Sequence, residues 1–94
     1  MGCTKLVSHP PADQHFERRY LTHGVIKFID FDKLKDEILE YYKKGKIAED
    51  RKHAGYEGPR YHIHIPVGKN SEIKVVVEET PKCLLPITTW PKNL

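Results

Sequence analysis

The chain has 94 residues, 38% of them hydrophobic and 31% charged, and its formal net charge at pH 7 is +3. These values predict one globular domain over residues 1–94 with one modest core, and they exclude a second domain and intrinsic disorder. The mild positive charge allows a nucleic-acid partner without requiring one. No apolar run reaches membrane-spanning length, so no membrane contact is expected.

The sequence contains two cysteines, Cys3 and Cys83. They are too few and too far apart for a zinc knuckle or a redox pair, and no secretory signal is recognisable. The expectation is therefore a reduced, cytoplasmic setting.

The first half of the chain predicts two helices. The first begins after two prolines and spans residues 12–23. The second follows a capping residue, Asp30 or Asp32, and carries apolar residues at helical spacing until Gly45 ends it. Residues 25–29 between them are apolar and β-branched, which predicts an extended connector or a brief strand.

The second half predicts a three-stranded antiparallel meander. Residues 46–60 are rich in glycine and charge, which predicts a long exposed loop. Residues 61–67 and 72–79 alternate in polarity and predict a hairpin, and residues 83–90 predict a third strand in which Pro86 favours an edge position or a bulge. This order of elements predicts an α+β domain with two N-terminal helices packed on one face of a three-stranded antiparallel sheet.

The stretch Tyr61-His62-Ile63-His64-Ile65-Pro66 is the most distinctive in the chain. In a strand, His62 and His64 share one face while the apolar residues share the other. Strict alternation in the last strand likewise puts Leu85, Ile87 and Thr89 on one face and Leu84, Thr88 and Trp90 on the other. Two neighbouring imidazoles can divide acid and base roles, share a metal or lie in solvent, and the stretch alone does not decide between them.

Four motifs occur in a recognisable order. They are His15-Phe-Glu-Arg-Arg19-Tyr-Leu-Thr-His23-Gly24-Val25, Tyr-Tyr-Lys-Lys-Gly45-Lys-Ile47, Lys74-Val-Val-Val77 and Ile87-Thr-Thr-Trp-Pro91. Together they resemble a small RelE-like family of unknown function over roughly residues 9–92. His23 stands where that family usually has arginine, and Trp90 stands where tyrosine is common.

The resemblance implies a RelE-like fold, shared with RelE and ParE toxins and with toxin nucleases, many of which cleave RNA without a metal. Such cleavage needs a base for the ribose 2′-hydroxyl, an acid for the leaving oxygen and a cation for the phosphate. The candidate catalytic residues are His15, Arg19, His62, His64 and Thr88. The candidate substrate-binding residues are Lys43, Lys44, Arg51, Lys52, Arg60 and Trp90.

The leading hypothesis is thus a toxin-like, metal-independent endoribonuclease without a cofactor, and it requires His15 and Arg19 to meet His62 and His64. Its expected partners are RNA, an antitoxin or immunity protein, and a second copy of the chain in a homodimer. Two alternatives stay open. One is a non-catalytic module that holds RNA or a protein through the basic residues. The other is a metalloenzyme in which His15 or Glu78 joins the two strand histidines as a third ligand.

Overall fold

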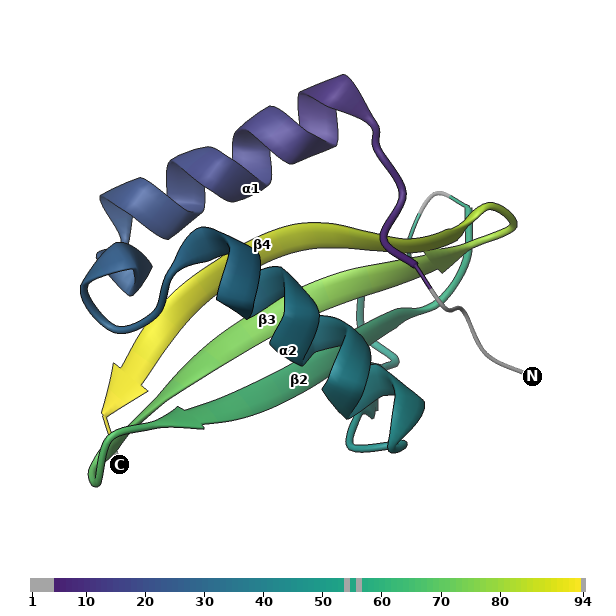
Figure 1. Ribbon diagram of the computed structural model, residues 1–94. Helices are drawn as coiled ribbons and strands as arrows, with labels where there is room; N and C mark the ends of the chain where they lie inside the picture. Colours follow the sequence, from purple (N-terminus) through teal and green to yellow (C-terminus); the bar gives the residue numbers. More distant parts are fainter. Residues whose placement is uncertain (1–4, 54, 56, 94) are drawn as a thin grey trace.

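The computed structural model describes residues 5–53, 55 and 57–93. Its helices are α1 (Pro10–Thr22), the short 3-10 helix η1 (Val25–Lys27) and α2 (Phe31–Lys43), and its strands are β1 (Ala48–Asp50), β2 (Arg60–Val67), β3 (Ser71–Thr80) and β4 (Cys83–Asn93). The strands form one antiparallel sheet in the order β1-β2-β3-β4. Both α-helices lie on the same side of this sheet, with α1 beside β4 and α2 crossing β2 and β3 (Figure 1).

The core lies between the helices and the sheet, as the sequence pattern predicts. Each element contributes its apolar stripe, and the buried residues are Phe16 and Tyr20 of α1, Leu34, Ile38 and Tyr42 of α2, Ile63 and Ile65 of β2, and Ile73, Val75 and Val77 of β3. Alternation along β2 and β3 therefore leaves the two strand histidines on the face turned away from the helices.

Local interactions define the helix ends. Two prolines open α1, where the missing N–H groups would have no helical acceptor. The Asp30 carboxylate accepts a hydrogen bond from the backbone N–H of Asp32 at 3.2 Å and caps α2. The buried Tyr20 hydroxyl donates to the Ile29 carbonyl at 2.6 Å, which ties α1 to the segment that leads into α2.

The predicted α+β arrangement is confirmed, but the sheet has four strands and not three. Residues 48–50, predicted as part of a loop, form β1 and pair with Arg60, Tyr61 and His62 of β2. A strand of three residues is too short to show the alternation of polar and apolar residues that identifies a strand in a sequence. It is recognised only by its pairing with β2. Residues 25–27 form a 3-10 helix, where the sequence predicted an extended segment.

The side chains on the two faces of β4 also differ from those that strict alternation predicts. A bulge puts Val76 opposite Thr88 but Val77 opposite Pro86, so one residue of β4 is extra. As a result Leu84 and Thr89 face the helices, and Thr88 and Trp90 face away. The prediction that Leu84 shares a face with Thr88 and Trp90 is wrong for this reason, although the predicted bulge and edge position near Pro86 are present.

Two observations bear on the expected setting. No helix of the described chain has the length and apolarity needed to cross a membrane. Cys83 at the start of β4 is disulfide-bonded, and Cys3, the other cysteine of the sequence, lies outside the described residues. The bonded state of Cys83 does not support the expected reduced setting.

Candidate functional site

The sheet surface turned away from the helices, here called the open face, carries the strand histidines. The strand register places these side chains, among others, on it: Asp50 of β1, Arg60, His62 and His64 of β2, Glu72, Lys74, Val76 and Glu78 of β3, and Thr88, Trp90 and Lys92 of β4. Most of them are ionisable or polar. The open face is therefore the part of the fold where acid–base chemistry is concentrated.

His62 is held by a carboxylate on β1. Its Nε2 lies 2.9 Å from Asp50 Oδ2, and its side chain, 22% exposed, is half-buried. A carboxylate oxygen only accepts hydrogen bonds, so Nε2 carries the proton of this bond. His62 Nδ1 is buried and has no hydrogen-bond partner among the described residues. The ring thus has one oriented nitrogen and one unused nitrogen.

Asp50 collects several donors besides His62. Its Oδ1 accepts from the backbone N–H groups of Lys52 at 3.0 Å and His53 at 3.1 Å, and the His53 ring lies 3.2 Å from Oδ2. The hydrogen bond from His62, supported by these further donors, holds the pKa of Asp50 far below its usual value, against the opposing effect of burial. Asp50 is therefore a permanent anion that orients His62.

His64, two residues along β2, has its own carboxylate. Its Nδ1 is hydrogen-bonded to Glu72 on β3, and the His64 side chain is 42% exposed. Because residues i and i+2 of a strand are about 6.7 Å apart, the two imidazoles stand side by side on the open face. Each has one nitrogen engaged by a carboxylate, which leaves Nδ1 of His62 and Nε2 of His64 for other partners.

The cations of the open face differ in whether they form an ion pair with a carboxylate. Arg60 Nε lies 3.1 Å from Glu78 Oε1, and the Glu78 side chain, 3% exposed, also accepts from the backbone N–H of Glu57 at 2.9 Å. Lys74 lies between His64 and Trp90 in the strand register, and its Nζ is 5.2 Å from the centre of the Trp90 ring. Among the described residues of this face, Lys74 and the exposed Lys92, which lies opposite Glu72, form no ion pair with a carboxylate.

The structure does not bring His15 and Arg19 to the strand histidines, which corrects the composite site predicted from the sequence. Burial of Phe16 and Tyr20 commits α1 to the helix side of the sheet, where His15 is exposed. Arg19 Nη1 instead lies 3.3 Å from His23 Nε2.

His23 links α1 to the last strand. Its Nδ1 lies 3.1 Å from the Thr89 carbonyl oxygen, which requires Nδ1 to donate, so in the neutral ring Nε2 accepts from Arg19. His23 therefore joins the end of α1 to β4.

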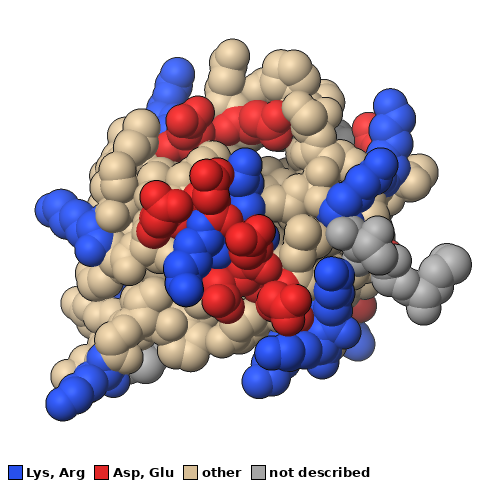
Figure 2. Space-filling model, in the orientation of Figure 1, with Lys and Arg blue, Asp and Glu red and all other residues tan. Residues whose placement is uncertain are grey.

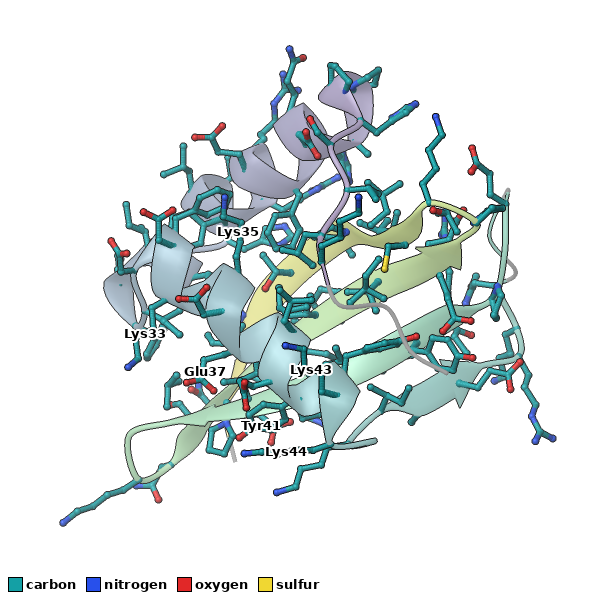
Figure 3. The ribbon with its side chains drawn as sticks, turned by 45° about the vertical axis from the view of Figure 1, so that its right-hand side comes forward. Lys33, Lys35, Glu37, Tyr41, Lys43 and Lys44 are labelled. Carbon is teal, nitrogen blue, oxygen red and sulfur yellow. The ribbon has the colours of Figure 1, made fainter. Side chains whose placement is uncertain are left out.

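The predicted substrate-binding cations are dispersed. Lys43 and Lys44 belong to the end of α2 on the helix side, where Lys44 Nζ lies 4.0 Å from Glu40 (Figure 3). Acidic side chains gather over the middle of this side with lysines and arginines among and around them (Figure 2). Arg51 and Lys52 follow β1 and are exposed. Lys43 and Lys44 therefore lie on the opposite side of the sheet from Arg60.

Thr88 and Trp90 are half-buried on the open face, as their predicted roles require. Thr88 lies opposite Val76, which separates it from His62 in the same row across the sheet. A direct contact between Thr88 and either histidine is therefore not made.

The predicted third metal ligands do not join the strand histidines. His15 is on the helix side, and Glu78 is engaged by Arg60 and Glu57. Within the described part of the chain, no three His, Cys, Asp or Glu side chains are arranged to hold a metal ion.

Two clefts of the described chain lie beside the helices. One of about 260 Å³ is lined by Phe16, Phe31 and the segment before α1, and one of about 320 Å³ is lined by Phe28, Tyr41 and the end of β2. Neither of these two clefts is lined by a histidine.

Sequence reasoning missed Asp50, Glu72 and Lys74. Glu72 and Lys74 alternate with buried residues in the predicted hairpin, so its pairing would have placed them beside His64. Asp50 gave no comparable signal because β1 was not predicted.

Comparison with known proteins adds no assignment to this geometry. No protein-family model, no curated protein and no solved structure matches the chain.

Proposed function

We propose that the protein is a toxin-like ribonuclease that cleaves RNA without a metal, and that its active centre is His62 and His64 on the open face. One observation carries the proposal: two imidazoles stand side by side, and each is oriented through one nitrogen by a carboxylate. The RelE-like resemblance of the sequence supports the same activity, and it also suggests an antitoxin or immunity protein as a partner.

The roles of the two histidines follow from their partners. His64 Nε2 is the more exposed free nitrogen, and it takes the proton from the ribose 2′-hydroxyl. The 2′-oxygen then bonds to phosphorus, the bond from phosphorus to the 5′-oxygen breaks, and a 2′,3′-cyclic phosphate forms. His62, which Asp50 orients through Nε2, gives its Nδ1 proton to the leaving 5′-oxygen.

Binding of the substrate also provides a hydrogen-bond partner for His62 Nδ1. His62 Nδ1 lacks a hydrogen-bond partner among the described residues, and the leaving oxygen supplies one. Because this atom is buried in the free protein, substrate binding has to displace the side chains that cover it. Lys74, beside His64, replaces Arg19 as the cation that stabilises the phosphate.

The charges of the open face make this activity dependent on pH. Asp50, Glu72 and Glu78 equal in number the cations Arg60, Lys74 and Lys92, so the face has no net charge when both histidines are neutral. Protonation of either histidine makes the face positive and favours a polyanion. The mechanism requires one protonated and one neutral histidine, so the cleavage rate is expected to follow a bell-shaped pH profile.

The test uses a labelled RNA oligonucleotide in EDTA and variants matched to the observed hydrogen bonds. Gln in His62→Gln can still donate to Asp50, and Asn in His64→Asn can still donate to Glu72. Each variant is expected to lose about 10²- to 10⁴-fold in cleavage rate. His9→Gln changes an exposed histidine outside the site and should leave the rate unchanged.

Three results would contradict the proposal. They are inert wild-type protein, cleavage of an oligonucleotide that lacks the 2′-hydroxyl at the scissile position, and a loss for His15→Gln as large as that for His64→Asn. The last result would mean that His15 of α1 takes part in the acid–base step.

A non-catalytic binding module is a second candidate, and one observation favours it. His62, His64 and Arg60 are each already paired with a carboxylate, which is also how a purely structural surface network is built. This function predicts that the protein binds RNA without producing a cyclic phosphate.

A further inference from the structure

Trp90 occupies an unusual place for a large aromatic residue. It is the single tryptophan of the chain, and it lies half-buried on the open face instead of in the core between sheet and helices. Lys74 Nζ lies 5.2 Å from its ring centre, within the range of a cation–π contact. The ring face is thus covered by one flexible side chain and not by packed core residues.

The register links this pair to the acid–base residues. His64, Lys74 and Trp90 are directly opposite one another on β2, β3 and β4, so they form one row across the sheet. Neighbouring strands are about 4.8 Å apart, which puts the backbone at Trp90 about 10 Å from that at His64. A ligand whose flat ring rests on Trp90 can therefore extend along the row, past the Lys74 ammonium, to His64.

We propose that Lys74 and Trp90 form a subsite for an unpaired base, so that the substrate is single-stranded RNA; this inference rests on the proposed function. The base replaces the Lys74 ammonium on the Trp90 ring, and the ammonium moves to the neighbouring phosphate. Stacking of this kind accepts any base, but it requires a base with a free face. Bases inside a duplex already stack on each other and cannot supply one.

The single tryptophan makes the subsite directly measurable. Short single-stranded RNA with 2′-O-methyl groups, which cannot be cleaved, is titrated into the full chain at low salt, where contacts between cations and phosphates are screened least. Stacking is expected to quench the Trp90 emission, and the same sequence as a duplex should leave the emission unchanged. An unquenched Trp90 at saturating single strand, or equal quenching by duplex, overturns the subsite.

Affinity variants provide a second measurement by anisotropy of labelled RNA. Trp90→Ala is expected to weaken single-strand binding about 5- to 150-fold, and Trp90→Phe by less, because phenylalanine retains a ring. The circular dichroism spectrum of each variant checks that it folds. An affinity for Trp90→Ala equal to that of wild type would overturn the subsite.

The two proposals fail in different ways. Quenching together with weakened binding, but without cleavage of unmodified RNA, sustains the subsite and removes the nuclease activity. Cleavage that is insensitive to Trp90→Ala sustains the nuclease and removes the subsite. Absence of any RNA binding overturns the subsite.

Discussion

Replacement of Arg60 by methionine is expected to destabilise the fold strongly, because it leaves the buried Glu78 carboxylate without its counter-charge. The Glu78 side chain is 3% exposed, and its two donors are Arg60 Nε at 3.1 Å and the Glu57 backbone N–H at 2.9 Å. Methionine retains much of the apolar stem but removes the cation. Breaking such a pair costs about 3–5 kcal/mol, or about 12 to 40 °C in the melting temperature of a domain of this size.

Three comparison variants separate this effect from general damage. Glu78→Gln removes the charge but keeps an acceptor, and it should cost about 1–2 kcal/mol. The double variant Arg60→Met/Glu78→Gln should be more stable than Arg60→Met alone, because no unpaired charge remains. Lys44→Met is the control, since Lys44 and Glu40 are 4.0 Å apart and both more than half exposed, so its loss should cost less than about 1 kcal/mol.

Urea unfolding followed by far-ultraviolet circular dichroism and by Trp90 emission measures these free energies. A cost for Arg60→Met no larger than that for Lys44→Met would refute the reasoning from burial.

Further predictions concern three other contacts. Tyr20→Phe leaves the buried Ile29 carbonyl without its donor and should cost about 1–2 kcal/mol in urea unfolding. Gly58→Ala should cost about 1–3 kcal/mol, because its Cβ would lie 1.8 Å from the Glu79 carbonyl oxygen; an unchanged unfolding midpoint would contradict that packing. The lowered pKa of Asp50 stabilises the fold fully above its unfolded pKa of about 3.9, and this contribution is lost as the pH falls below that value. The stability difference between wild type and Asp50→Asn should therefore be large at neutral pH and shrink below about pH 4.

Much of the fold could be predicted because burial imposes a period on the sequence. The alternation around Ile63 and Ile65 identified β2, and the helical spacing of Leu34 and Ile38 identified α2. Alternation failed in β4, since the extra residue at the bulge shifts every later side chain to the other face. A bulge depends on the partner strand, and the local pattern does not contain that information.

The candidate site was predicted only in part for a similar reason. His62 and His64 stand out because both occupy the polar positions of one strand. Their carboxylate partners depend on the register between strands, and Asp50 comes from a strand of three residues. The predicted contribution of His15 required α1 to reach around the sheet, which the burial of its apolar stripe prevents.

The contact between α1 and β4 joins the first helix to the last strand. The segment before α1 also bonds to this strand, where the Val7 N–H donates to the Leu84 carbonyl at 2.8 Å, and His23 meets the Thr89 carbonyl. During synthesis on the ribosome, α1 emerges long before the strand that receives it. Each strand of the meander can pair with the preceding strand as soon as it leaves the ribosome, but α1 can dock only after β4 has formed. Docking of α1 on β4 is therefore expected to be the late step that completes folding.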